Sequence, residues 1–178
     1  MRVISGKYKG RKLEFPIDSK VRPTADMVKG ALFSSLFDIE GYYFLDLFCG
    51  CGGIGVEALS RGAKEVHFVD NNPKSLAYVR KNVEKLENNY KIFKSDYLSF
   101  LKNAKISYDI IFMDPPYLKK EFYDNALMII KQNNLLSNEG KIVLEHDENL
   151  KVDFVDFEVL SNKRYGKKYL TFLKQIKQ

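Results

Sequence analysis

The segment Asp114-Pro115-Pro116-Tyr117 combines a hydrogen-bond acceptor, a rigid backbone and an aromatic ring within four residues. It follows the apolar run 110–113, which is typical of a buried strand. An exocyclic amino group on a nucleic-acid base is a poor nucleophile, because its lone pair is delocalised into the ring. The Asp114 side chain and the Pro115 carbonyl can accept its two hydrogens and so localise that lone pair. The segment therefore suits group transfer to such an amine.

Rigidity and stacking favour the same chemistry. Consecutive prolines fix φ and disfavour helical conformations at the preceding residues, which holds the Pro115 carbonyl in place. Tyr117 offers a flat face on which an unpaired base can stack, worth ~1–3 kcal/mol per base. Because positioning carries most of such a reaction, no strong general base is required. We expect Asp114, Pro115, Pro116 and Tyr117 to form the catalytic site; the alternative is a proline-rich loop that only ends a strand.

A second segment has the spacing of a nucleotide-like cofactor site. Gly50, Gly52 and Gly55 form G-x-G-x-x-G between an apolar run and a helical stretch. Glycine lets the backbone turn tightly and approach a ligand closely. Asp70 ends the next apolar run, where a carboxylate can accept hydrogen bonds from both ribose hydroxyls of an adenosine. The glycine pattern alone is weak evidence, but the order of strand, turn, helix and acid strengthens it.

An acid at the end of the first strand bears on which cofactor binds. Asp46 can hold the ammonium of a methionine moiety there, whereas it would repel a pyrophosphate, so it favours S-adenosylmethionine over NAD. Asp96 is placed either to meet the adenine amino group or to cap the following helix. The expected cofactor-binding residues of this core are Asp46, Phe48, Gly50, Gly52, Gly55, Asp70, Asn71, Asp96 and Tyr97.

Charge is concentrated at the two ends of the chain. The net charge is +6 and the sequence pI is about 9.1. Residues 1–12 hold five basic residues and residues 160–178 hold six, with no acidic residue in either stretch. Lys and Arg that neutralise phosphates drive binding to nucleic acids, so this distribution favours a polyanionic partner. A solvated basic face is the alternative for the final stretch.

Length and composition bound the class of protein. A chain of 178 residues with 45% hydrophobic residues fits one domain, and it has no apolar run long enough to span a membrane. The first residues lack the apolar core of a signal peptide, so we expect a cytoplasmic protein. Cys49 and Cys51 are expected as reduced thiols, and with two distant histidines they do not suggest a metal site.

Periodicity predicts alternating strands and helices after a basic hairpin at 2–15. Thr24 is the expected N-cap of the first helix. The predicted strands are 42–48, 65–70, 90–94, 108–113, 141–145, 152–160 and 169–173, and the predicted helices are 25–37, 54–61, 73–86, 97–103 and 122–132.

This order predicts an α/β fold with a mostly parallel, seven-stranded sheet and an antiparallel hairpin at one edge. Residues 1–41 are expected as an appendage of hairpin and helix, and residues 42–178 as the core, within effectively one domain.

The motifs together resemble the class I methyltransferases, whose fold is Rossmann-like, and more closely the RsmD-like family. That family methylates the N2 of a guanine in bacterial 16S ribosomal RNA. The resemblance covers nearly the whole chain and is carried by the following segments: Arg2-Val3-Ile4-Ser5-Gly6, Gly10-Arg11-Lys12-Leu13, Arg22-Pro23-Thr24 with Asp26 and Val28, Asp46-Leu47-Phe48 with Gly50, Gly52 and Gly55, Glu57-Ala58-Leu59-Ser60-Arg61-Gly62-Ala63, Asp114-Pro115-Pro116-Tyr117, and Arg164 with Gly166.

The resemblance implies S-adenosylmethionine as cofactor and ribosomal RNA as partner, within the small subunit or an assembly intermediate, with a monomer as the default. It implies that Arg22 and Thr24 border the cofactor pocket. The residues expected to contact RNA are Arg2, Lys7, Lys9, Arg11, Lys12 and Arg164. Cys49 and Cys51 depart from the usual Ala and Ser of the family. Lys29-Gly30 replaces its usual Arg-Glu pair.

Three alternatives stay open at this point. A DNA adenine-N6 methyltransferase shares the Asp-Pro-Pro-Tyr motif but usually needs a target-recognition region that 178 residues do not accommodate. An NAD-dependent oxidoreductase shares the glycine pattern but leaves that motif unexplained. A non-catalytic RNA-binding module is disfavoured by the intact Gly50, Asp70 and Asp114.

Overall fold

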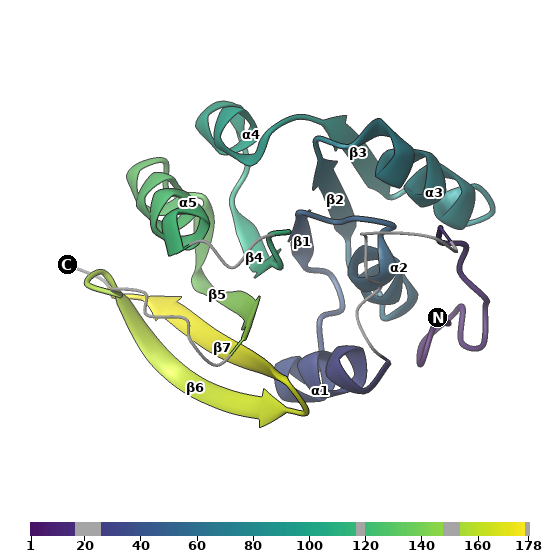
Figure 1. The fold of residues 1–178 in the computed structure, drawn as a ribbon, viewed down its shortest axis with the longest axis horizontal. Coiled ribbons are helices and arrows are strands. Elements are labelled where there is room, and N and C mark those ends of the chain that lie inside the picture. The colour runs from purple at the N-terminus through teal and green to yellow at the C-terminus, as the bar shows by residue number, and fades with distance from the viewer. Residues whose placement is uncertain (17–25, 117–119, 148–153, 177–178) are drawn as a thin grey trace.

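The structure is a computed structural model that describes residues 1–16, 26–116, 120–147 and 154–176 of the 178-residue chain. Within these residues one seven-stranded sheet forms the centre of the molecule, in the order β3-β2-β1-β4-β5-β7-β6 (Figure 1). The strands are β1 (Tyr43–Leu47), β2 (Glu65–Asp70), β3 (Tyr90–Lys94), β4 (Tyr108–Met113), β5 (Leu136–His146), β6 (Phe157–Tyr165) and β7 (Lys168–Gln175).

Strands β1 to β5 pair in parallel, and β7 runs antiparallel to both β5 and β6. The expected α/β arrangement, a mostly parallel sheet with an antiparallel hairpin at one edge, is therefore confirmed. In an open sheet of this kind ligands bind outside the carboxyl ends of the parallel strands. Those ends are Leu47, Asp70, Lys94, Met113 and His146.

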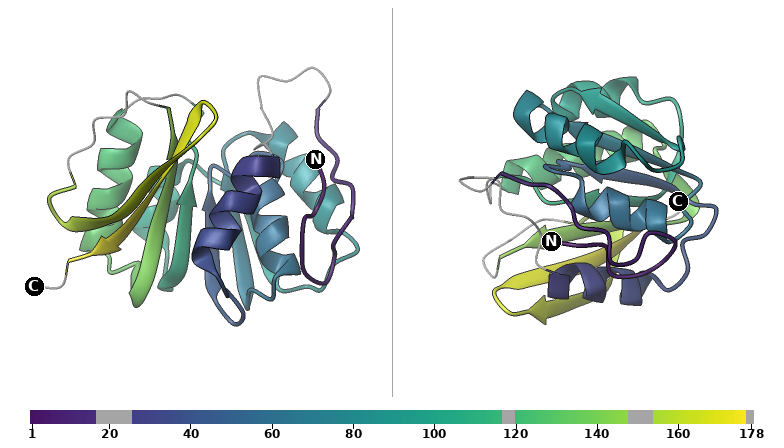
Figure 2. Two further views of the ribbon diagram at one scale, coloured as in Figure 1. Left: turned by 90° about the horizontal axis from the view of Figure 1, so that it is seen from below. Right: turned by 90° about the vertical axis from the view of Figure 1, so that its right-hand side faces the viewer.

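Helices cover both faces of the sheet (Figures 1 and 2). Side chains of α1, α2 and α3 form one core layer with Phe44 and Phe112, and those of α4 and α5 form the other with Leu45 and Met113. Because both faces are buried there, the inner strands β1, β2 and β4 are mostly apolar, whereas the edge strand β3 is partly exposed. The helices are α1 (Asp26–Leu36), α2 (Gly53–Ser60), α3 (Pro73–Val83), α4 (Tyr97–Asn103) and α5 (Lys120–Gln132).

Most predicted boundaries agree with the structure. The predicted ranges 65–70, 90–94, 97–103 and 108–113 coincide with β2, β3, α4 and β4. Other ends move by a few residues; α3, for example, ends at Val83 rather than at residue 86.

The sixth strand was predicted at 152–160; β6 spans Phe157–Tyr165, so the prediction overlaps it at 157–160 and ends five residues too early. β6 is the outer edge strand and is mostly exposed, so its second half carries polar residues and lacks an apolar signal. The turn at Gly166, with φ 64°, lets β6 and β7 stay paired up to Tyr165 and Lys168. Strand β5 likewise begins at Leu136, before the predicted residue 141.

The predicted hairpin at 2–15 is a loop closed by one antiparallel bridge, between Arg2 and Lys12, rather than a two-stranded ladder. The Val3 N–H donates to the Arg11 carbonyl at 2.9 Å. Val3 is buried in the same core layer as α1 and α2, so the loop is anchored to the core. The division into 1–41 and 42–178 stays a prediction. No helix in the described part of the chain is long and apolar enough to cross a membrane.

Gly55 allows α2 to pack closely on β2. A Cβ atom at Gly55 would lie 2.2 Å from Phe68 Cε1 and overlap the ring. We therefore expect Gly55→Ala to lower the free energy of unfolding by about 3 kcal/mol. The control is Gly30→Ala in α1, where the nearest atom would be Ile4 Cδ1 at 3.8 Å, and which should raise stability by ~1 kcal/mol. Urea unfolding followed by circular dichroism measures both, and equal stabilities would contradict this packing role.

Candidate functional site

The turn between β1 and α2 is tight and fixed by the neighbouring strand. The N–H groups of Phe48 and Cys49 both donate to the Val69 carbonyl, at 3.0 and 2.9 Å. The backbone φ is 71° at Phe48, 53° at Gly50 and 81° at Gly52, all in the left-handed region. Glycine adopts this region freely, whereas at Phe48 it is strained. Such strain is found at ligand sites, where the surrounding structure maintains it.

Two acids tie this turn to the sheet. The Asp70 carboxylate accepts the Gly50 N–H at 2.9 Å and the Asn72 N–H at 2.8 Å. The Asp46 carboxylate accepts the Gly55 N–H at 2.9 Å, in the first turn of α2. Gly55 thus stabilises the turn through its backbone N–H, and its lack of a side chain lets α2 pack on Phe68. Its role in the glycine pattern is therefore structural.

Asp46 is a buried acid, with 1% of its surface exposed. Burial raises its pKa to about 7; the Gly55 hydrogen bond lowers it, and the charges of Asp70 and Asp114 raise it. Burial also raises the pKa of Asp70. A buried carboxyl whose charge is disfavoured gains most from a bound cation, because an opposite charge favours the ionised form. Asp46 is therefore suited to an ammonium group.

Asp96 caps α4: its carboxylate accepts the Ser99 N–H at 3.0 Å, and its side chain is exposed. The capping alternative is thus confirmed, and contact with an adenine stays a prediction. The neighbouring Tyr97 packs against Phe48 with the rings tilted by 43° and their centroids 5.1 Å apart. Phe122 of α5 completes an aromatic cluster, 5.2 Å from Tyr97 and 5.8 Å from Phe48. Sequence reasoning missed Phe122, because nothing in its local pattern distinguishes it from a core residue.

Asp114 follows β4 on the same face of the sheet as Asp46. Burial raises its pKa to about 6, while the charge of Lys168 lowers it and that of Asp147 raises it. Pro115 is buried and Pro116 is exposed. Tyr117, Arg22 and Thr24 lie outside the described residues, so their expected roles, and the N-cap expected at Thr24, stay predictions.

A further carboxyl, Glu145, lies next to Asp114 and was not predicted as a site residue. β4 and β5 pair Met113 with Leu144, so the following residues, Asp114 and Glu145, are neighbours at the carboxyl edge. Burial raises the pKa of Glu145 to about 8, and the charge of Asp114 contributes to this increase. Asp46, Asp114 and Glu145 thus form a row of carboxyls across the ends of β1, β4 and β5. The available sequence signal was an acid at the end of an apolar run, as at Asp46 and Asp70.

The basic residues of the N-terminal loop divide between two ends of α2. Met1 contacts Gly53 at the start of α2, which places the bridged pair Arg2 and Lys12 near the glycine turn. The Lys7 N–H donates to the carbonyl of Ser60, at the end of α2 away from this edge. The Lys7 ammonium pairs with Glu87. Lys9 is exposed and Arg11 is partly exposed.

The unusual Lys29 anchors this loop. Its side chain is fully buried, and its ammonium donates to the Arg2 carbonyl, 3.7 Å from Glu57 Oε2 and 3.6 Å from Asp26 Oδ1. Glu57 also accepts the Ile4 N–H at 2.8 Å. The buried charges of Lys29 and Glu57 therefore hold the loop on α1 and α2, which gives Lys29 a structural role.

Arg164 and Tyr169 face each other in the C-terminal hairpin. The Arg164 guanidinium donates to the Gly166 carbonyl at 2.9 Å and lies 5.9 Å from the centre of the Tyr169 ring. Cys49 and Cys51 are buried free thiols, and burial raises the pKa of Cys51 to about 11, so neither is a reactive thiolate.

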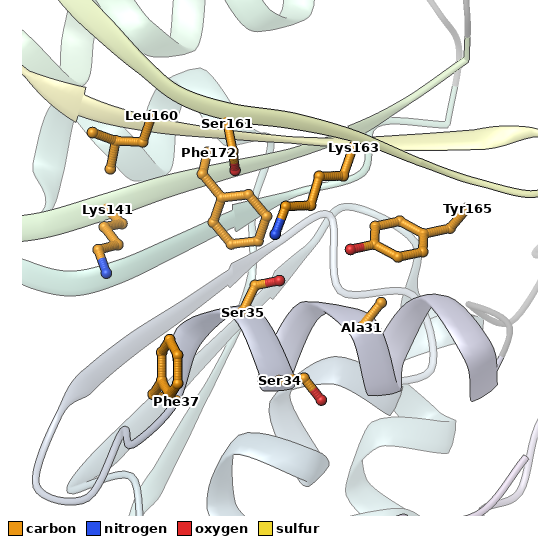
Figure 3. A pocket seen from close by; sticks show the side chains of 10 residues that line it. All are labelled: Ala31, Ser34, Ser35, Phe37, Lys141, Leu160, Ser161, Lys163, Tyr165 and Phe172. Atoms are coloured by element: carbon orange, nitrogen blue, oxygen red, sulfur yellow. The ribbon is translucent and has the colours of Figure 1, made fainter.

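A separate groove of about 490 Å³ lies between α1 and the β6–β7 hairpin (Figure 3). None of the residues expected to bind cofactor or base lines it. The lining residues are Ala31, Ser34, Ser35, Phe37, Lys141, Leu160, Ser161, Lys163, Tyr165 and Phe172.

Residues 1–174 match the family described as "Conserved hypothetical protein 95". This chain belongs to that family. The "Putative rRNA methyltransferase YlbH" of Bacillus subtilis (strain 168) is 38% identical, over 85% of each chain. The "Ribosomal RNA small subunit methyltransferase D" of Escherichia coli (strain K12) is 32% identical, over 83% of this chain and 75% of the relative. The resemblance inferred from the motifs is therefore confirmed.

A solved structure shares the whole fold. The "Putative methyltransferase yhhF from Escherichia coli" is 28% identical, with a TM-score of 0.88 over 98% of this chain and 97% of the other. The fold is thus the Rossmann-like methyltransferase fold, as the sequence predicted. The glycine turn, the acids at Asp46 and Asp70 and the Asp114 segment lie at the edge of the sheet where such a fold binds ligands.

Proposed function

We propose that this protein transfers a methyl group from S-adenosylmethionine to the N2 amine of a guanine in small-subunit ribosomal RNA. The observation that carries the proposal is the pair of carboxyls at the ends of β1 and β4, of which Asp46 is buried and Asp114 part-buried. Asp46 is suited to a cation, and Asp114 is suited to the hydrogens of an amine. Asp46 pairs with Phe112, two residues before Asp114, so the two groups lie near each other on one face of adjacent strands. The relatives named as ribosomal RNA methyltransferases support this substrate class.

The residues around the glycine turn fit S-adenosylmethionine. Asp46 would bind the ammonium of the methionine moiety, and Asp70 would accept the ribose hydroxyls with the lone pairs that Gly50 and Asn72 leave. The aromatic cluster of Phe48, Tyr97 and Phe122 offers an apolar surface beside the turn. When bound, the cofactor supplies a methyl group on a sulfonium, which is a strong electrophile.

The residues after β4 fit the amine. The ionised Asp114 carboxylate and the Pro115 carbonyl would accept the two N2 hydrogens, orient the nitrogen lone pair and stabilise the positive charge that develops on nitrogen. The proton that N2 loses after transfer is acidic and can leave to water. Arg2 and Lys12 lie near this edge and can neutralise backbone phosphates. Action as a monomer in the cytoplasm, on the small subunit or an assembly intermediate, stays a prediction.

The other functions find less support. NAD would place a pyrophosphate near the buried Asp46, whose charge would repel it. DNA adenine methylation is not indicated by the names of the relatives. A decayed RNA-binding module would have no need for the left-handed, strained backbone at Phe48.

Loss of the gene should remove one methyl group from a guanine of small-subunit RNA. Restoring the wild-type gene should return the methyl group, and restoring the Asp114→Asn variant should not. A neutral amide oxygen is a weaker hydrogen-bond acceptor than a carboxylate and stabilises the developing positive charge less. In vitro, Asp114→Asn should lower kcat by about 100-fold, while S-adenosylhomocysteine still binds. Mass spectrometry of RNA digests and methyl incorporation measure these effects. Undiminished turnover by Asp114→Asn would remove the catalytic assignment.

The reaction should depend on the ionisation of Asp114. Burial raises the pKa of Asp114 to about 6. Only the ionised carboxylate both accepts a hydrogen bond from the amine and stabilises the positive charge that develops on its nitrogen. At saturating S-adenosylmethionine, protonation of Asp114 should therefore add a decrease in kcat/KM for RNA of about tenfold per pH unit below pH 6. The residual activity of Asp114→Asn should lack this decrease. A flat profile from pH 5 to 7 in the wild type would argue against the proposed role of the carboxylate.

A further inference from the structure

The position of Glu145 indicates how the target base is selected. It ends β5 next to Asp114, and its antiparallel partner on β7 is Leu170. Side chains alternate along a strand, so Glu145 shares the face of Val143 and Leu170, which belong to the core layer under α1 and α2. Phe112 and Asp114 alternate in the same way on β4. The Glu145 and Asp114 side chains therefore emerge on one face at the same edge.

One oxygen of Glu145 has no hydrogen-bond partner among the described residues. The side chain is 4% exposed, and Oε2 is the buried side-chain oxygen or nitrogen that lacks a hydrogen bond among the described residues. The other oxygen, Oε1, lies 3.9 Å from the Lys168 ammonium, and the Tyr123 hydroxyl donates to the Glu145 backbone carbonyl at 2.7 Å. Buried polar atoms are nearly always bonded, and an exception beside a reactive group suggests an acceptor reserved for a ligand.

We infer that Glu145 selects guanine by accepting its N1–H at Oε2 while Asp114 and Pro115 hold the N2 amine. This inference rests on the proposed function and deepens it. In guanine two ring nitrogens flank the carbon that bears the amine; N1 carries a hydrogen and is a donor, and N3 carries a lone pair. In adenine and cytosine the ring nitrogen next to the amine carries a lone pair instead. A carboxylate at this position therefore bonds guanine and repels the other two bases.

The charges around Glu145 set the pH range in which its oxygens can accept a hydrogen. Lys168 from β7 faces Oε1, while Asp114 after β4 and Asp147 after β5 add negative charge. Burial raises the pKa of Glu145 to about 8, and the Lys168 charge lowers it. The accepting, ionised form therefore increases as the pH rises from 7 to 9. Lys168 lies on the Oε1 side of the carboxyl, at 3.9 Å, and Oε2 is the oxygen that the described residues leave without a hydrogen bond.

The direct test replaces the N1 donor of the base by an acceptor and the Glu145 acceptor of the protein by a donor. In Glu145→Gln the amide oxygen should face Lys168, which leaves the NH2 at the Oε2 position. The substrate is small-subunit RNA, ligated and reconstituted with either guanosine or 2,6-diaminopurine riboside at the mapped target. Diaminopurine keeps the N2 amine but has a lone pair at N1. The wild type should prefer guanosine about tenfold or more, and Glu145→Gln should reverse or abolish that preference.

Matched variants separate reading of the base from damage to the fold. Glu139→Gln, an identical change at an exposed position of the same strand, should leave the preference unchanged. The rise in kcat/KM between pH 7 and 9 should disappear in Glu145→Gln and persist in Glu139→Gln. If Glu145→Gln does not fold, Glu145→Asp withdraws the oxygen by one methylene and should lower kcat/KM for guanosine about tenfold.

An unchanged preference in a folded Glu145 variant would overturn the inference. Absence of guanosine methylation by the wild type would instead contradict the proposed function itself, so the two failures are distinguishable.

Discussion

The burial of like charges at one edge of the sheet is the constraint on which this site depends. Parallel pairing places the ends of β1, β4 and β5 side by side, and each end carries a carboxyl: Asp46, Asp114 and Glu145. Burial raises their pKa values to about 7, about 6 and about 8, so near neutral pH the row is only partly ionised. A site of this kind binds cations and hydrogen-bond donors, because either one favours the ionised forms.

The rest of the fold keeps these groups in place. The Asp46–Gly55 and Asp70–Gly50 hydrogen bonds fix the turn after β1, and Phe68 fills the space that Gly55 leaves. Lys29 and Glu57 hold the basic N-terminal loop against α2. Because these contacts are buried, the loop near the turn and the acids of the site share one rigid support.

The sequence predicted the parts of the fold that follow from burial. Strands such as β2 and β4 are apolar because both faces are covered, so their limits agree with the prediction. The edge strand β6 is mostly exposed and lacks that signal, so its predicted range was displaced toward the N-terminus. Glu145 is an acid at the end of an apolar run, but it was missed because its place beside Asp114 depends on the pairing of β5 with β4. Asp96 was ambiguous for a similar reason, since a helix cap and a ligand contact require the same residue type.

Calorimetric titration at pH 7, in two buffers of different ionisation enthalpy, tests the central claim that Asp46 is a buried acid poised for a cation. S-adenosylhomocysteine should bind and release about half a proton, because its ammonium would ionise a carboxyl whose pKa is about 7. 5′-Methylthioadenosine, which lacks that ammonium, should bind without this release, and NAD should not bind. Binding of NAD, or equal proton release by the two adenosine ligands, would contradict the account.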